Sequence, residues 1–305
     1  MSNILITGAS GFLGKEMCQV LSKDNNIWTL GRTPTAYNHI ESDLSNASIK
    51  LPKVEFKQVI HLAGKAHSYP KTEKEIQAFE EVNYQGTLHL LNALENQTKL
   101  KTFVFASTIA VYGLENGSNI NELFPTQPTT PYGKSKLNAE KAIIDWCTNR
   151  GIQYLILRLP LIAGENPIGN LGAMKKAIQK GYYVRVKGNN AQKSLVLASD
   201  IAHLVAQFNA KSGIYHLTDG YNPTFNEIEK AFEKAMNRKI RLNIPLSFLK
   251  KLATVGDALQ KIHIKIPLST LTLNKLTSSL TFNDDKAKRE LGWKPNSVLD
   301  YLSNN

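Results

Sequence analysis

A tyrosine and a lysine four residues apart are the side chains best suited by type and spacing to acid–base chemistry. Tyr132 and Lys136 begin a segment with helical periodicity, so one helical face carries both of them. An ammonium beside a phenol favours the phenolate, and we expect Lys136 to bring the pKa of Tyr132 down toward working pH. Such a phenol can exchange a proton with a carbonyl or an alcohol. The pair alone also fits an ordinary exposed helix face.

A hydroxyl at a strand end strengthens the catalytic interpretation. Thr108 directly follows the apolar run 103–107, which ends in Ser107, and precedes Tyr132 by 24 residues. Doubly wound sheets place their ligands at the carboxyl ends of their strands. We therefore predict that the Thr108 hydroxyl hydrogen-bonds the reacting oxygen beside Tyr132.

A glycine-rich turn follows the first apolar run. Gly8 suits a sharp turn from strand to helix, and Gly11 allows a pyrophosphate to approach the backbone closely. Gly14 allows the helix to pack tightly against the strand. The helix start then offers free N–H groups and the positive end of its dipole to phosphates. This pattern predicts a dinucleotide-binding loop, formed by Gly8, Ser10, Gly11, Phe12, Leu13 and Gly14.

Alternating apolar runs and helical segments must position these residues. Residues 4–7, 27–31, 58–62, 103–107 and 154–159 are typical of buried parallel strands, and residues 12–22, 73–96 and 132–149 of helices. The alternation predicts an α/β fold, a doubly wound parallel (Rossmann) sheet with a small, mainly helical C-terminal substrate domain.

The domain boundaries follow from where this alternation weakens. We expect residues 1–165 to form the dinucleotide-binding domain, with 195–217 returning to it as strands at 194–198 and 213–218. The helix between those strands has Asp200 as its expected N-cap. Residues 166–305 would form the interleaved substrate-binding domain.

Composition limits the classes of partner. The net charge of +12 comes from 37 Lys and Arg against 25 Asp and Glu, without a basic run interleaved with aromatics, so we expect no nucleic-acid partner. No apolar run reaches ~18 residues, which argues against membrane insertion. Two cysteines and the lack of a signal peptide predict a cytoplasmic protein. His67, His203 and His216 share no ligand spacing, so no metal is expected.

The combined motifs resemble the extended short-chain dehydrogenase/reductase family, in its nucleotide-sugar epimerase, dehydratase and reductase branch. Similar stretches run through nearly the whole chain. They include His61-Leu62-Ala63-Gly64, Val82-Asn83-Tyr84-Gln85-Gly86-Thr87, Leu157-Arg158-Leu159-Pro160 and Arg289-Glu290-Leu291-Gly292-Trp293-Lys294-Pro295.

The resemblance implies roles for further residues. Lys136 would grip the nicotinamide ribose and Thr108 would help Tyr132 to hold the sugar oxygen, while Asn83 supports the site. On the substrate side, the C-terminal arginine of many relatives is not evident around 278–280. The family also makes a homodimer possible. The remaining implied contacts are Asp43 and Leu44 with the adenine, Leu62, Ala63 and Gly64 along the cofactor, Asn170 at the diphosphate, and Lys193 where many relatives carry a phosphate-binding arginine.

The end of the second strand bears on the choice of cofactor. Dehydrogenases that prefer NAD place an acidic residue there for the ribose 2′-hydroxyl, but this chain has Gly31 followed by Arg32. The glycine leaves room for a 2′-phosphate and the arginine can pair with it. We predict NADP, with NAD as the alternative.

Two residues after the strand-end threonine differ from those of the family's dehydratases, and this difference limits the reactions that the chain can catalyse. Those enzymes carry an Asp-Glu pair after the strand-end threonine, whereas Ile109 and Ala110 cannot transfer a proton. The C-terminal pattern is most similar to reductases of UDP-4-keto-6-deoxy-N-acetylglucosamine. The alternatives are a UDP-sugar 4-epimerase with retained NAD and a non-catalytic NADP-binding sensor. Such sensors typically lose the tyrosine or the lysine, and this chain keeps both.

Overall fold

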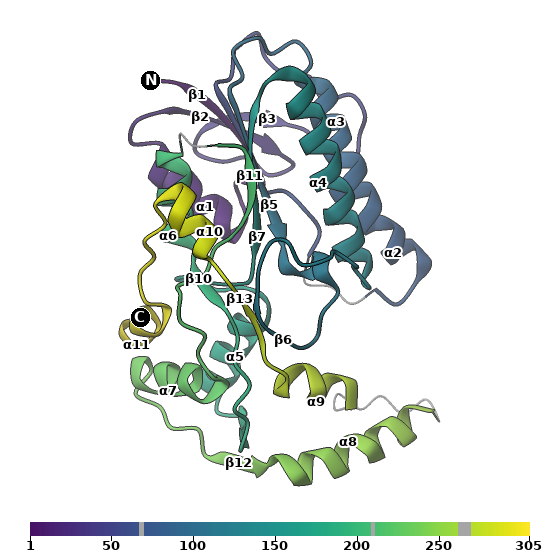
Figure 1. Cartoon of the computed structure of the whole chain (residues 1–305), viewed down its shortest axis with the longest axis vertical. Helices are drawn as coiled ribbons and strands as arrows, with labels where there is room; N and C mark the ends of the chain where they lie inside the picture. Colours follow the sequence, from purple (N-terminus) through teal and green to yellow (C-terminus); the bar gives the residue numbers. More distant parts are fainter. Residues whose placement is uncertain (67–69, 209–210, 262–269) are drawn as a thin grey trace.

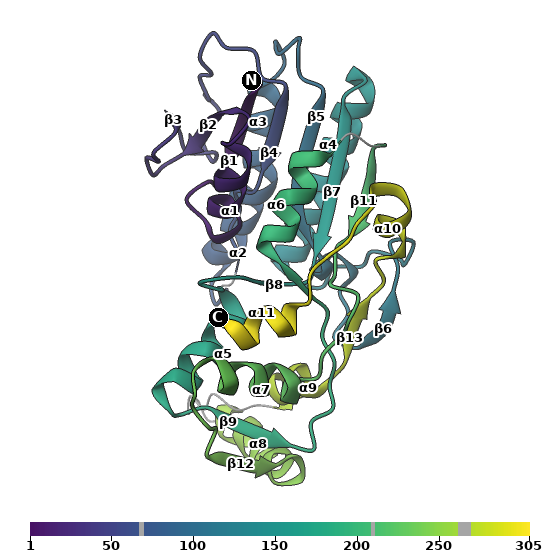
Figure 2. The same cartoon turned by 90° about the vertical axis from the view of Figure 1, so that its left-hand side faces the viewer.

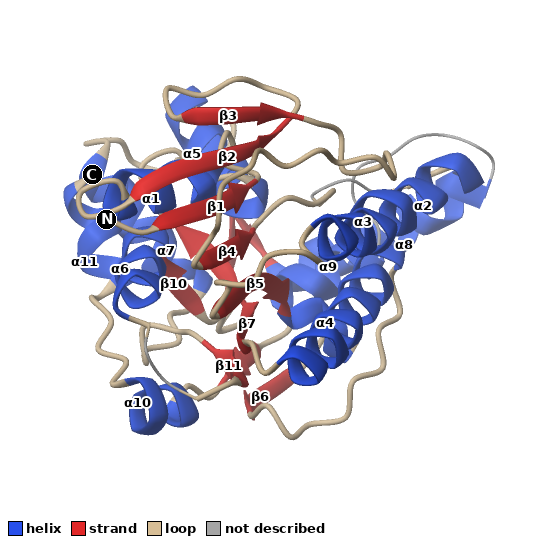
Figure 3. Ribbon diagram, turned by 90° about the horizontal axis from the view of Figure 1, so that it is seen from above, coloured by secondary structure: helices blue, strands red, loops and turns tan. Residues whose placement is uncertain are grey.

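The computed structural model describes residues 1–66, 70–208, 211–261 and 270–305. A seven-stranded parallel sheet forms its upper half in the view of Figure 1. Its strand order is β11-β7-β5-β4-β1-β2-β3, so the chain starts in the middle of the sheet and winds outward in both directions (Figure 3). The fold is the predicted doubly wound α/β sheet. The strands are β1 (Asn3–Thr7), β2 (Asn26–Gly31), β3 (Asn38–Glu41), β4 (Gln58–His61), β5 (Thr102–Thr108), β7 (Gln153–Leu159) and β11 (Gly213–His216).

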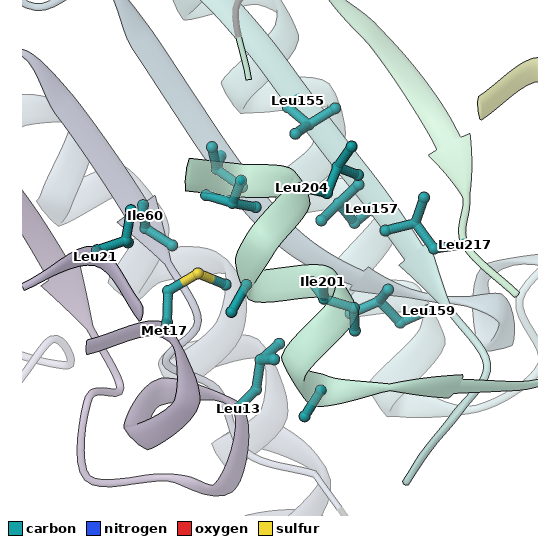
Figure 4. Packing of buried hydrophobic residues seen from close by; sticks show 14 of the residues in the cluster. Leu13, Met17, Leu21, Ile60, Leu155, Leu157, Leu159, Ile201, Leu204 and Leu217 are labelled. Carbon is teal, nitrogen blue, oxygen red and sulfur yellow. The ribbon is translucent and has the colours of Figure 1, made fainter. Parts of the chain in front are cut away.

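Helices cover both faces of this sheet, as Figure 3 shows. One face carries α1 (Phe12–Leu21) and α6 (Ala198–Gln207), whose Met17 and Ile201 join one apolar core (Figure 4). The other face carries α3 (Gly86–Ala93) and α4 (Pro131–Arg150), with a second core that contains Leu90 and Ile143. These apolar faces explain why the strands read as continuous hydrophobic runs.

The segment 73–96 is not the single regular helix that its periodicity predicts. It consists of α2 (Glu73–Phe79), the π-helix η1 (Glu80–Gln85) and α3. The first helix starts at a capping box between Thr72 and Glu75. A π-helical turn is rare and is often found at functional sites, and here it contains Asn83.

The lower half of the molecule in Figures 1 and 2 is built from helices and three two-stranded parallel sheets. The sheets pair β8 (Leu161–Ala163) with β10 (Leu195–Leu197), β9 (Val184–Lys187) with β12 (Leu242–Pro245), and β6 (Gly117–Ile120) with β13 (Leu280–Phe282). The helices of this half are α5 (Gly169–Lys180), α7 (Phe225–Ala235), α8 (Leu246–Lys261), α9 (Thr270–Thr277) and α11 (Val298–Asn304), whereas α10 (Asp285–Leu291) lies in the upper half and contacts β11.

Two local expectations for residues 194–218 are wrong. Of the two strands expected to return to the main sheet, β11 does so, whereas β10 pairs with β8 instead. The N-cap of α6 is Leu197 rather than Asp200. The Asp200 carboxylate accepts hydrogen bonds from the backbone and side chain of Asn296, both at 2.7 Å, and so ties α6 to the C-terminal segment. The predicted domain boundaries stay a prediction.

Candidate functional site

The turn between β1 and α1 is closed by backbone contacts that leave no room for side chains. Gly8 has a left-handed φ of +70°, and a Cβ on it would lie 2.6 Å from the backbone nitrogen of Ala63. A Cβ on Gly14 would lie 2.2 Å from the Gly8 carbonyl oxygen. The Gly11 N–H donates to that same oxygen at 3.0 Å. Glycine at positions 8 and 14 is therefore a requirement of this turn.

The start of α1 fits a dinucleotide diphosphate. Its N-cap, Gly11, makes no side-chain capping bond, and the first turn has no acidic residue to repel an anion. Ser10 and Gly11 are exposed, and the partly buried Phe12 packs against Gly164. The Leu13 side chain points into the core (Figure 4), so this residue can offer a ligand only its backbone.

The residues after β4 join this loop to the helix of the predicted acid–base pair. The backbone N–H groups of Leu62 and Ala63 donate to the carbonyl and side-chain oxygens of Thr7, each at 3.2 Å. A Cβ on Gly64 would lie 3.8 Å from Lys136 Nζ. The predicted cofactor segments thus meet at adjacent strand ends.

Arg32 and Asp43 lie together beyond the end of β2. The Arg32 side chain is 80% exposed, and its Nη1 lies 3.8 Å from the Asp43 carboxylate. Hydrogen bonds from the backbone and hydroxyl of Ser45 lower the pKa of Asp43. Gly31 faces open space, since a Cβ there would have no atom within 4 Å. The neighbouring Leu44 is instead buried, with its carbonyl accepting from His89 Nδ1 at 2.8 Å.

The structure brings Thr108, Tyr132 and Lys136 to the carboxyl end of β5. Helix α4 begins at Pro131, where the Thr130 hydroxyl caps it by accepting from the Gly133 N–H at 3.1 Å. That start places Tyr132 in the first turn, and its phenol is hydrogen-bonded to the side chain of Thr108.

The electrostatics of this pair differ from the sequence prediction. Burial raises the pKa of Tyr132, and the hydrogen bond with Thr108 opposes this increase. The prediction that Lys136 lowers the pKa of Tyr132 is therefore wrong for this arrangement. Lys136 is itself buried, with Nζ 3.9 Å from the Phe105 ring centroid. Burial lowers its pKa to about 7, and attraction to Glu140 opposes that decrease.

Asn83 links the cofactor side of the site to α4, in line with the supporting role expected for it. Its Oδ1 accepts from the Lys65 N–H at 2.6 Å, and its Nδ2 donates to the Lys65 carbonyl and to Ser135 Oγ, both at 3.0 Å. Ser135 Oγ donates to the Tyr132 carbonyl at 3.0 Å. The π-helical turn thereby holds the first turn of α4 in register with the strand ends.

Sequence reasoning missed a buried polar network beside this site. Ser107, Arg158 and His216 are register partners on β5, β7 and β11. The Glu140 carboxylate accepts from Ser107 Oγ and from Arg158 Nη2, the latter at 2.7 Å. Arg158 also donates to the Tyr112 hydroxyl at 2.8 Å, and that oxygen lies 2.7 Å from His216 Nε2. The sequence offers one indication of this network, because Arg158 is a charged residue within the apolar run 154–159.

The two predicted substrate residues lie apart from this network. Asn170 is exposed in the first turn of α5, and Lys193 is half-buried beside β13, where burial lowers its pKa. Among the described residues, neither side chain forms a hydrogen bond or an ion pair. Ile109 and Ala110 begin the 3₁₀-helix Ile109–Tyr112 that follows Thr108, and neither of their side chains can transfer a proton.

Metal ligands do not cluster in the described part of the chain, where no group of three His, Cys, Asp or Glu side chains could hold an ion. His203 Nδ1 lies 2.8 Å from the Ser199 carbonyl oxygen. His67 lies outside the described residues. None of the helices that the structure describes is long and apolar enough to cross a membrane.

Comparison with known proteins points to one family. The model of the NAD dependent epimerase/dehydratase family matches residues 4–216, which include the glycine-rich turn and the site around Tyr132. A curated relative from Escherichia coli O157:H7 is 28% identical over 93% of this chain and 88% of its own length. That relative is N-acetyl-alpha-D-glucosaminyl-diphospho-ditrans,octacis-undecaprenol 4-epimerase.

Two further similarities come from a reductase and from a solved structure. GDP-6-deoxy-D-mannose reductase from Pseudomonas aeruginosa is 34% identical over 51% of this chain and 50% of its own. The crystal structure of a UDP-glucose 4-epimerase from Thermotoga maritima, with UDP-glucose, superposes with a TM-score of 0.75 at 19% identity. That similarity covers 99% of this chain and 96% of the other, and it shows the shared fold.

Proposed function

This chain belongs to the NAD-dependent epimerase/dehydratase family, and on that premise we propose that it reduces the 4-keto group of a UDP-6-deoxy-hexosamine with NADPH. It is an NAD(P)-dependent enzyme of the nucleotide-sugar epimerase and reductase type. The observation that carries the proposal is the Tyr132 phenol, hydrogen-bonded to Thr108, with its pKa raised by burial. A raised pKa keeps this phenol protonated, as the reduction of a ketone requires.

The proposed chemistry divides the work among three side chains. NADPH supplies the hydride when it is bound. Tyr132 donates its proton to the sugar oxygen as that oxygen gains negative charge, and Thr108 holds the phenol in place. Lys136, once charged, stabilises the tyrosinate that remains and grips the nicotinamide ribose. Attraction to Glu140 supports that charge.

The end of β2 supports the preference for NADPH that we propose. Gly31 leaves open space for a 2′-phosphate, and the exposed Arg32 supplies a guanidinium beside it. Asp43 competes for this guanidinium at 3.8 Å, although hydrogen bonds from Ser45 already engage its carboxylate. We propose that Arg32 turns from Asp43 toward the phosphate.

On the substrate side, we propose that Asn170 and Lys193 bind the diphosphate of the sugar nucleotide. Both side chains lack partners among the residues that the structure describes, so they are available to a ligand. Ile109 and Ala110 cannot transfer a proton, so we propose a reaction at a single carbon of the sugar rather than the removal of water across two carbons.

The test is an assay with purified protein and UDP-4-keto-6-deoxy-N-acetylglucosamine. We expect one NADPH to be oxidised for each sugar reduced, and the protein to purify without tightly bound NAD. Absence of NADPH oxidation with this sugar and with other 4-keto UDP-sugars would contradict the proposal.

A 4-epimerase with retained NAD is the second candidate, and the E. coli relative favours it because the similarity covers 93% of this chain. An epimerase interconverts UDP-N-acetylglucosamine and UDP-N-acetylgalactosamine without added cofactor. The same assay should include N-acetylglucosaminyl-diphospho-undecaprenol, because the name of that relative specifies a sugar carried on a lipid diphosphate. Product on either substrate without NADPH would favour the epimerase over the reductase.

A further inference from the structure

An exposed apolar surface marks the end of the molecule that lies farthest from the main sheet. It is formed by β12, α8 and α9, which lie along the lower edge of Figures 1 and 2. Four side chains contribute to it: Leu242 is 51% exposed, Phe248 53%, Leu252 40% and Leu276 38%. We call these four residues the apolar end surface.

Helix α8 is anchored by one apolar stripe and exposes another. Leu249 and Ala253 are buried with Leu273 of α9 in a small core of their own. Phe248 and Leu252 each precede one of these buried residues and form a second stripe, four residues apart, that this core does not cover. The outer stripe is therefore not needed to attach α8 to the rest of the chain.

The segment that carries Leu242 and Phe248 of this surface is rich in positive charge. The segment from 238 to 251 contains no acidic residue, and the only one between 238 and 283 is Asp257. The segment from 238 to 251 alone therefore carries five of the twelve net positive charges of the chain. Five exposed cations belong to the segment: Arg238, Lys239, Arg241, Lys250 and Lys251.

We infer that the apolar end surface docks on an anionic lipid bilayer. Exposed Phe and Leu side chains beside Lys and Arg are the combination that enters the boundary between headgroups and acyl chains. Each cation near an anionic surface adds attraction. The attachment that we infer is peripheral, with the apolar end surface lying at the boundary between headgroups and acyl chains. A second copy on this surface would bring the same cations face to face across a two-fold interface, which opposes such a dimer.

Vesicle co-flotation of the full chain tests this inference. Vesicles of phosphatidylcholine with phosphatidylglycerol should bind the protein, and vesicles of phosphatidylcholine alone should bind it at least ~10-fold more weakly. The double variants Phe248→Ser/Leu252→Ser and Lys250→Gln/Lys251→Gln should each reduce binding to the anionic vesicles by ~10-fold or more. All four side chains are exposed, so the fold should tolerate both variants.

The matched control is Lys99→Gln/Lys101→Gln, which removes the same charge from exposed positions just before β5, at the opposite end of the molecule. This control should bind like the wild type, which would exclude an effect of net charge alone. Absence of binding to anionic vesicles, or equal losses in the control and the end-surface variants, would overturn the inference. So would a dimer in solution that Phe248→Ser/Leu252→Ser dissociates. Flotation requires no catalysis, so its outcome is independent of the proposed reaction.

Discussion

The buried carboxylate of Glu140 lies one helical turn after Lys136 on α4 and opposes the loss of the lysine's proton. Burial lowers the pKa of Lys136 to about 7, and attraction to Glu140 limits this decrease. Glu140 is itself fixed by Arg158, whose Nη2 lies 2.7 Å from the carboxylate. The charge state of Lys136 is thus coupled to a network that extends across β5, β7 and β11.

Glu140→Gln should strongly destabilise the protein. It leaves the buried Arg158 guanidinium without its counter-charge, and breaking a buried pair in this way costs about 3–5 kcal/mol. Glu95→Gln is the matched control, because its pair with Arg150 is partly exposed and should contribute less than about 1 kcal/mol. Urea unfolding monitored by circular dichroism measures both. Equal losses of unfolding free energy would contradict the importance of the buried network.

Tyr132→Phe should abolish most turnover while leaving cofactor binding intact. The substitution keeps the ring and removes the proton that we propose is donated to the sugar oxygen, so kcat should fall by ~10²-fold or more. Cofactor affinity, measured by quenching of protein fluorescence, should change little. Near-normal kcat in this variant would refute the role of Tyr132.

Arg32→Ala should weaken binding of NADPH far more than binding of NADH. A charge-assisted pair with the 2′-phosphate is lost only with NADPH, and such a pair contributes about 1.5–3 kcal/mol, equivalent to a roughly tenfold or larger change in Kd. Arg289→Ala removes another largely exposed guanidinium and should leave both affinities unchanged. If wild-type protein binds NADH as tightly as NADPH, the assignment of Arg32 fails.

Gly8→Ala should disrupt the dinucleotide loop. The new methyl group would approach the Ala63 nitrogen to 2.6 Å, so the backbone of one of the two loops must move. Gly151→Ala is a control with a similar left-handed φ, +65°, but with no atom within 4 Å of its Cβ. Both variants incur the cost of the positive φ. Only Gly8→Ala should also lose cofactor affinity, by tenfold or more, in the fluorescence titration. Similar affinities in both variants would argue against a cofactor at this turn.

Acidification should destabilise the fold through its buried histidines. Burial, together with a smaller contribution from the charge of Lys136, lowers the pKa of His61 from its ordinary value of 6.5 to about 3. Between pH 6.5 and 3 the unfolded chain binds a proton that the folded chain refuses, so stability is present above pH 6.5 and is lost as the pH falls. The loss at pH 4 is about 3 kcal/mol.

Urea unfolding at several pH values checks this expectation. His61→Asn should flatten the decline of the unfolding free energy between pH 6.5 and 4, whereas His203→Asn, on the surface, should not. An unchanged slope in His61→Asn would show that other groups cause the loss of stability in acid.

The sequence by itself determined the doubly wound sheet and the turn that follows β1. Both depend on local patterns, since a buried parallel strand needs a continuous apolar run and the turn needs glycine at positions 8 and 14. The sequence also predicted that Tyr132 and Lys136 share one helical face, because residues four apart lie on the same face of an α-helix. Thr108 could be placed beside them because strands of a parallel sheet end at one edge.

Only the tertiary structure decided the electrostatics of the site. The degree of burial set the pKa of Tyr132 and of Lys136 in directions that their spacing did not predict. The ion pair of Glu140 with Arg158 depends on strand β7 lying beside β5. The hydrogen bonds of Asn83 likewise join the π-helical turn to Lys65 and Ser135, which are distant in sequence. Desolvation and long-range pairing arise only when distant segments pack together, so neither can be read from local sequence.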